Sequence, residues 1–80
     1  MNNLYELELG RIAKVENIYC EENIKRRLMD LGIVRGTEIK AILKSPSGNP
    51  KAYEVRGSVI AIRSEDAKKI EIKNKWEIWR

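Results

Sequence analysis

The sequence predicts a mainly β domain, a small closed or half-closed barrel of five short strands with one helix. Three observations carry this prediction. Apolar and polar residues alternate in several short stretches, which is strand spacing. Glycines fall between these stretches, where tight turns are needed. A single stretch between the first two strands has helical spacing instead. The expected strands are residues 11–18, 37–44, 51–56 and 59–63, with a short fifth strand at Ile70 and Ile72.

Composition limits the class of protein. Eighty residues make one domain with a small core, expected over residues 1–73, followed by a tail at 74–80. The net charge of +4 comes from 16 basic and 12 acidic residues that are interspersed, whereas a nucleic-acid-binding arm shows a denser basic block. With one cysteine no disulfide can form within the chain, so we expect a cytoplasmic protein. We expect no membrane insertion, because no apolar run is long enough to span a bilayer.

The N-terminal segment and first strand supply part of the core. Leu4 and Leu7 are expected to close one end of it. Within residues 11–18, Ala13 and Val15 share one face and other apolar residues lie opposite. The alternation is imperfect, which predicts a β-bulge or a strongly bent strand.

The expected helix carries one apolar stripe, formed by Ile24, Leu28 and Leu31 at i, i+4 and i+7. The stripe ends at Gly32, which can adopt a positive φ and close the helix as a left-handed cap. Ile33 would then contact Leu28, as in a Schellman ending. Leu28 and Leu31 are therefore expected to matter for folding only.

Polar and glycine residues predict the caps and turns. Asn23 is expected to cap the helix and Ser64 a second, short helical turn. Gly36 suits the third position of a type II turn, where φ is positive. Gly57 marks a tight connection between strands, and residues 45–50, with two prolines, a glycine and an asparagine, form a loop.

Two of the expected strands differ in their apolar pattern. Ile39, Ala41 and Leu43 alternate with their neighbours and share one face of the second expected strand. Residues 59–62 are apolar at every position, so they are expected to be buried on both faces.

Five short motifs follow one another along the chain: RRLMDLG from Arg26, GTE from Gly36, GNP from Gly48, VRG from Val55 and IAIR from Ile60. The ordered set, which covers nearly the whole chain, resembles the FeoA family of small cytosolic accessory proteins in bacterial ferrous iron uptake. The resemblance implies an SH3-like barrel with the helix inserted between the first two strands. It also implies a partner, the FeoB-type membrane iron transporter with its cytosolic GTP-binding domain. The barrel also resembles the C-terminal domain of iron-dependent repressors, so fold alone does not define function.

The chain departs from the family pattern in three places. Arg35 stands where proline commonly precedes the glycine, and Ser47 replaces a larger apolar residue in the loop. The tail with Trp76 and Trp79 is longer than the pattern requires. Because strand alternation continues into it, we expect residues 75–80 to be partly ordered, with an edge that favours weak pairing with a second copy.

The helix face turned away from the core is the expected partner surface. At 100° per residue, Lys25, Arg26 and Met29 all point away from the apolar stripe. Methionine and arginine are enriched at protein interfaces, and lysine adds charge that steers an acidic partner. We therefore predict that these three residues contact the transporter.

The sequence favours neither a metal centre nor an enzyme. Cys20 has no histidine or second cysteine to join it, and Glu21, Glu22 and Asp30 are read as charges of a solvated helix. No nucleophile–base pair and no phosphate-binding loop is present, so we expect no catalysis and no cofactor. Two alternatives to the interaction module stay open: a stand-alone metal-responsive regulatory domain and a small nucleic-acid-binding barrel.

Overall fold

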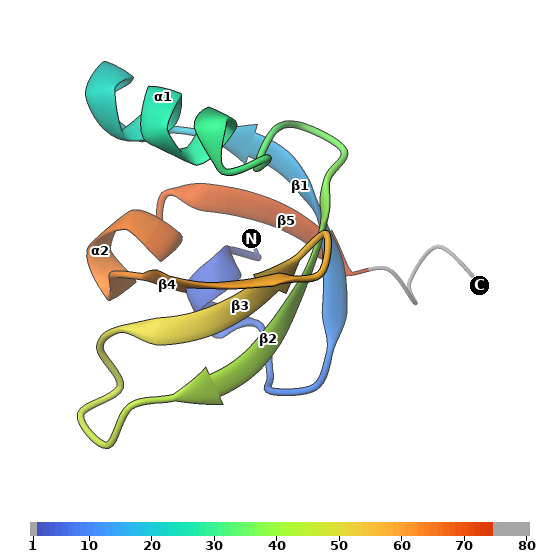
Figure 1. The fold of residues 1–80 in the computed structure, drawn as a ribbon, viewed down its shortest axis with the longest axis vertical. Helices are drawn as coiled ribbons and strands as arrows, with labels where there is room; N and C mark the ends of the chain where they lie inside the picture. Colours follow the sequence, from blue (N-terminus) through green and yellow to red (C-terminus); the bar gives the residue numbers. More distant parts are fainter. Residues whose placement is uncertain (1, 75–80) are drawn as a thin grey trace.

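The computed structural model describes residues 2–74, which form a strongly curved five-stranded antiparallel sheet with α1 at one side (Figure 1). The strand order is β4-β3-β2-β1-β5. The prediction of a mainly β fold with a helix between the first two strands is confirmed. The expected bounds of the first four strands lie within one residue of those observed, and the fifth strand runs on to Asn74. The elements are η1 (Leu4–Glu6, a 3₁₀ turn), β1 (Ile12–Ile18), α1 (Glu22–Asp30), β2 (Glu38–Lys44), β3 (Lys51–Val55), β4 (Ser58–Ile62), α2 (Ser64–Ala67) and β5 (Ile70–Asn74).

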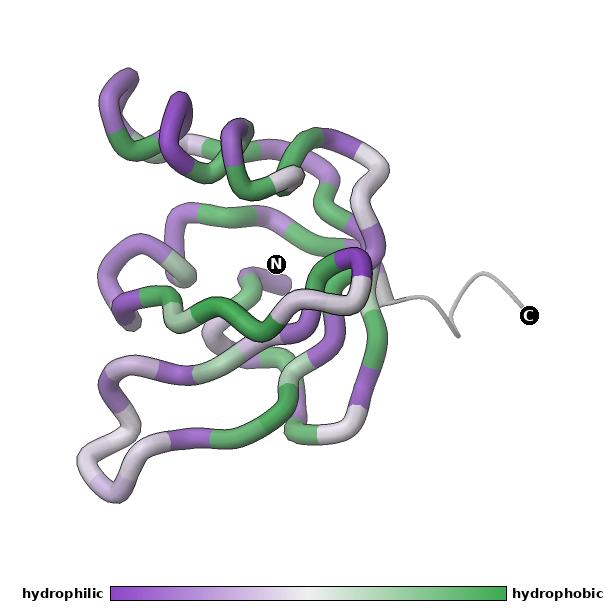
Figure 2. The backbone as a smooth tube through the Cα atoms, in the orientation of Figure 1, coloured by the Kyte–Doolittle hydropathy of each residue, from purple (hydrophilic) through white to green (hydrophobic). Residues whose placement is uncertain are grey.

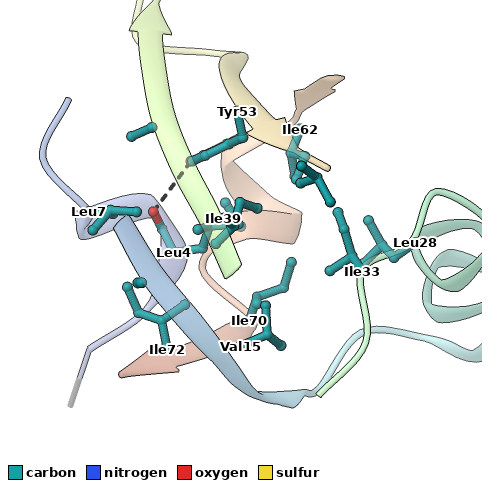
Figure 3. Close-up of a cluster of buried hydrophobic side chains, with 14 residues drawn as sticks. Leu4, Leu7, Val15, Leu28, Ile33, Ile39, Tyr53, Ile62, Ile70 and Ile72 are labelled. Carbon is teal, nitrogen blue, oxygen red and sulfur yellow. Dashed lines mark hydrogen bonds between the residues drawn. The ribbon is translucent and has the colours of Figure 1, made fainter. Parts of the chain in front are cut away.

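One hydrophobic core fills the concave side of the sheet. Apolar residues alternate with polar ones along the strands, whereas α1 is largely hydrophilic with apolar residues at intervals (Figure 2). Leu4 and Leu7 enter the core from one side, as expected, and Leu28 and Ile33 enter from the α1 side (Figure 3). The remaining buried apolar residues come from the strands and α2: Ala13, Val15, Ile39, Ala41, Tyr53, Val55, Ile62, Ala67, Ile70 and Ile72.

The predicted irregularity of the first strand is present. The pairing between β1 and β5 shifts register between Val15 and Asn17, so Glu16 lies at a β-bulge. A bulge bends the strand and increases its local twist. The end of β1 is thereby bent relative to the part that pairs with β2.

The end of α1 is the Schellman motif that the sequence predicts. Gly32 has a φ of +92°. Its N–H donates to the Met29 carbonyl at 2.9 Å, and the Ile33 N–H donates to the Leu28 carbonyl at 2.8 Å. The apolar contact that accompanies this motif is also formed, since Leu28 and Ile33 are both buried.

The turn after the helix is also as predicted. Gly36 has a φ of +90°, and the Thr37 N–H closes residues 34–37 by donating to the Val34 carbonyl at 3.0 Å. The Thr37 hydroxyl donates to the Gly32 carbonyl and accepts from the Val34 N–H, each at 3.0 Å. The buried threonine therefore connects the helix end to the start of β2. At the β3–β4 hairpin, Arg56 and Gly57 both have positive φ, as a two-residue type I′ turn requires.

Two predictions about strand faces are wrong, that Leu43 shares a face with Ile39 and Ala41 and that residues 59–62 are buried on both faces. Leu43 is 55% exposed, because a register shift between Ala41 and Leu43 turns the end of β2 away from the core. In β4 only Ile62 is buried, and Val59 is 62% exposed. Burial alternates along the strand, with Ile60 and Ile62 toward the core and Val59 and Ala61 toward solvent.

The helix predictions also need corrections. Leu31 does not complete the core stripe: it is the C-cap residue of α1 and is 45% exposed. Glu21, not Asn23, is the N-cap residue, and it makes no side-chain capping bond. Ser64 is the first residue of α2 rather than its cap, and its N–H donates to the Asn49 side chain at 2.9 Å.

The outer edge of β5 meets the N-terminal segment. The Ile72 N–H donates to the Asn2 carbonyl at 3.0 Å, and Asn3 forms a bridge with Glu71. Part of the edge expected to pair with a second copy is thus already occupied. The tail with Trp76 and Trp79 lies outside the described residues. Within residues 2–74 no helix is long and apolar enough to cross a membrane.

Candidate functional site

A groove of about 450 Å³ lies between α1 and the end of β1. Three successive segments of the chain line it. They are residues 16–19 at the end of β1, Lys25 and Met29 of α1, and residues 33–35 after the helix. We call this hollow the α1–β1 groove.

The helix places two of the lining side chains. Lys25 and Met29 are four residues apart and so lie on the same face of α1. Leu28 points into the core, and Ile24 packs partly against it. Met29 therefore projects away from the barrel, with 53% of its surface exposed.

The Schellman ending places the third lining segment. It reverses the chain so that Ile33 enters the core. Val34 and Arg35 then follow on the groove side, held by the turn that Gly36 closes. The cap and turn predicted from local sequence thus build one wall of the site.

Large apolar side chains are exposed around the groove. Tyr19 is 63% exposed and Val34 37%, and both lie close to Met29 in the lining. Other exposed apolar side chains of the described chain, such as Leu9, Leu43 and Val59, belong to separate elements. A cluster of exposed apolar side chains at a concave surface is typical of an interaction site.

The charged side chains of the groove are available to a partner. Lys25 and Arg35 are its cations and Glu16 its carboxylate. Within residues 2–74 none of the three takes part in an ion pair; the salt bridges found there join Arg11 to Glu8 and Arg63 to acidic residues near α2. The groove therefore combines an apolar lining with two unpaired cations.

The predicted contact residues are brought together in part. Lys25 and Met29 both line the groove, whereas Arg26 is exposed on α1 beside it. Sequence reasoning did not assign Tyr19 or Val34 to the site. The only signal for Tyr19 was a large aromatic residue at the end of a strand.

A second hollow, of about 390 Å³, offers a different surface. It is lined by residues 36–40 of the turn and β2, with Ile12, Glu54, Arg56 and Gly57. Gly36 and Gly57 serve turns there, and no exposed large apolar side chain lines it. It is therefore less suited to holding another protein.

The side chains considered as metal ligands do not lie together at one site. Glu21 and Glu22 begin α1, and Asp30 ends it. Cys20 Sγ lies 3.7 Å from the Asp66 carbonyl oxygen. Burial raises the pKa of the Cys20 thiol, Asp66 raises it further, and Lys69 acts in the opposite direction. Across residues 2–74 no group of three or more such side chains is placed to hold a metal ion.

Comparisons with known proteins give a consistent result. A model of the FeoA domain family matches residues 2–74. The putative Fe(2+) transport protein A of Campylobacter jejuni is 30% identical over 69 residues, which are 86% of this chain and 93% of that protein. A fusion of Fe(2+) transport protein A with the Fe(2+) transporter FeoB in Porphyromonas gingivalis is 29% identical over 69 residues, 86% of this chain but 8% of the fusion.

Solved structures support the same relationship. FeoA from Chlorobium tepidum superposes with a TM-score of 0.89 at 34% identity, covering 92% of this chain and 70% of that one. FeoA from Stenotrophomonas maltophilia, complexed with zinc and described as a prokaryotic SH3 domain protein, gives 0.79 at 32% identity, covering 91% of both chains. A manganese-dependent transcriptional repressor gives 0.82 at 14% identity over 91% of this chain and 41% of its own, which shows a shared fold alone.

Proposed function

The chain belongs to the FeoA family of ferrous iron transport accessory proteins, a non-catalytic SH3-like domain, and we propose that it binds the cytosolic part of a FeoB-type transporter. The protein would act in the cytoplasm and be recruited to the inner face of the membrane. In the Porphyromonas gingivalis relative both parts belong to one chain. That arrangement supports physical association, because covalent linkage raises the effective concentration of one part at the other.

The observation that carries the proposal is the α1–β1 groove. Met29, Tyr19 and Val34 expose apolar surface there, and covering that surface would favour binding by about 25 cal/mol for each Å² removed from water. Lys25 and Arg35 add positive charge beside it, which favours an acidic partner and increases its rate of encounter. Arg26 extends this positive surface along α1.

The two alternatives have less support. The likeness to manganese-dependent transcriptional repressors is at 14% identity and extends to the fold only. A nucleic-acid-binding barrel needs aromatic side chains interleaved with basic ones on one face. Tyr53 is buried, whereas Tyr19 stands beside the apolar groove.

The test is a folded variant with an altered groove. Arg26→Glu combined with Met29→Ala should keep a near-native melting temperature, because both side chains are exposed. It should lose binding to the transporter's isolated cytosolic domain and fail to restore iron-dependent growth.

A matched control makes the same kinds of change elsewhere. Lys44→Glu with Leu43→Ala also reverses one exposed cation and truncates one exposed apolar side chain, at the end of β2. This control should bind like the native protein. Equal binding by the groove variant and the native chain would contradict the proposal and direct attention to residues 45–50 or to the tail.

A further inference from the structure

The edge of β1 that faces α1 lacks a strand partner beyond its first half. Pairing between β1 and β2 covers Ile12, Ala13 and Lys14. It continues for one more residue, since the Val15 N–H donates to the Thr37 carbonyl at 2.9 Å and its carbonyl accepts from the Gly36 N–H at 2.7 Å. The chain then turns away through residues 34–37. On the opposite edge, β5 stays paired as far as Ile18.

The alternation of backbone groups shows which way the open edge points. The Tyr19 N–H donates to the Lys69 carbonyl at 2.8 Å, on the β5 side. In an antiparallel ladder successive residues point their N–H and carbonyl groups to opposite edges. The Ile18 N–H and carbonyl therefore point to the side where, within residues 2–74, no strand is paired with the end of β1. An open strand edge of this kind is a template for an added strand.

The α1–β1 groove runs along the open edge of β1, where a short extended segment could pair. Residues 16–19 form one side of it and the side chains of Lys25 and Met29 the other. Four residues of strand correspond to roughly 13 Å at about 3.3 Å per residue.

The lining also defines the chemistry of the occupant. A side chain directed toward α1 would meet Met29 and Val34, so an apolar residue fits there. Lys25 and Arg35 favour carboxylates. Glu16 lies at the bulge, where it would repel a further acidic residue.

We propose that the α1–β1 groove binds a short extended segment of the transporter's cytosolic part, which pairs with the open edge of β1 as an additional strand. The segment carries an apolar residue over Met29 and acidic residues beside it. This inference rests on the proposed function and specifies how the partner is held. Main-chain hydrogen bonds would supply affinity that does not depend on the sequence of the segment, and the side chains of its alternate residues would supply selectivity.

Amide hydrogen exchange of the chain in complex with the transporter's cytosolic domain tests the backbone contact. The Ile18 amide should exchange more slowly in the complex, by about tenfold or more, because it gains a ladder hydrogen bond. The Tyr19 amide is an internal control: it is already bonded to Lys69 and should change much less.

A second measurement tests the strand geometry from the partner's side. Overlapping peptides that tile the cytosolic domain would identify the binding segment, and each of its amides would then be methylated in turn. Only every second amide of an added strand faces β1, so loss of binding should alternate along the segment.

The outcomes separate this inference from the proposed function. If the domain binds and the Arg26→Glu, Met29→Ala variant does not, yet Ile18 is unprotected and methylation shows no alternation, strand addition is overturned while the function stands. If the domain fails to bind the native chain at all, both are overturned. Protection of Ile18 together with alternation confirms both.

Discussion

The two sides of the core differ in where their polar and exposed groups lie. On the η1 side, Lys51 is 6% exposed, and its ammonium donates to the carbonyls of Tyr5 at 2.8 Å and Leu7 at 3.0 Å. The buried Tyr53 hydroxyl donates to the Leu4 carbonyl at 3.3 Å. On the α1 side, Met29 is largely exposed and faces the groove.

The contrast separates stability from recognition. Among the described residues no buried side-chain nitrogen or oxygen lacks a hydrogen bond, and the η1 side is where the buried polar groups of Lys51 and Tyr53 are satisfied. Such satisfaction is needed because an unpaired buried polar group costs about 1–3 kcal/mol. The α1 side keeps apolar and charged groups in solvent, where they contribute little to folding and are available to a partner.

The largest expected effect is on the η1 side. Leu4 is fully buried, so Leu4→Ala should lower the free energy of unfolding by about 2–5 kcal/mol. Met29→Ala, on the exposed groove face, should change it by less than about 0.5 kcal/mol. Denaturant unfolding of the two variants measures both values. Similar losses in the two would abolish the distinction between the two sides.

The next effect concerns the turn that joins the groove wall to the barrel. Apart from its two chain neighbours, nothing in the described chain would lie within 4 Å of a Cβ at Gly36, so a substitution there is opposed by the backbone conformation rather than by a clash. Gly36→Val should cost more than about 1 kcal/mol, because a β-branched residue resists positive φ. Thermal melts should show a lower midpoint than for Gly36→Ala, and a native midpoint for the valine variant would count against the argument.

A smaller effect should appear at alkaline pH on the η1 side. Burial raises the pKa of the Tyr53 hydroxyl above its usual 10.0, and Tyr5 raises it further. Above pH 10.0 the unfolded chain therefore ionises at this tyrosine first, and the native protein loses stability. Tyr53→Phe should be less stable by about 1 kcal/mol at neutral pH, through loss of one hydrogen bond.

Comparing the native protein with Tyr53→Phe isolates the contribution of the tyrosine to the pH dependence of stability. Burial lowers the pKa of Lys51 from its usual 10.5, and Lys44 adds to the shift. Titration of this lysine therefore stabilises the folded state as the pH rises toward 10.5. Lys51 and Cys20 are common to both proteins, and their effects cancel in the difference. The difference in unfolding free energy should stay constant at neutral pH and narrow above pH 10.0; a constant difference there would refute the assignment.

The last prediction is that metal ions do not bind tightly. Calorimetric titration of the chain with Zn²⁺ or Fe²⁺ should give no tight site, because the sequence has no histidine and one cysteine. Cys20→Ser should give the same trace. A stoichiometric site at micromolar concentration in the native chain, lost in that variant, would assign Cys20 a ligand role.

Several predictions from short stretches of sequence were accurate, although those for the Asn23 and Ser64 caps were not. The Schellman cap at Gly32, the turn at Gly36 and the bulge in β1 depend on the backbone preferences of a few neighbouring residues. The outward direction of Met29 follows from helical spacing once Leu28 is buried. These features require no knowledge of which elements pack together, and the sequence alone therefore determined them.

Features that depend on which segment lies beside which were decided by the tertiary structure. Val59 is exposed although residues 59–62 are all apolar, because only the β4 face that carries Ile60 and Ile62 packs against the core. Lys51 is buried because η1 brings two carbonyls to its ammonium. The α1–β1 groove exists only because the end of β1, one face of α1 and residues 33–35 meet in space. No local pattern encodes that meeting, since burial of the common core brings the segments together.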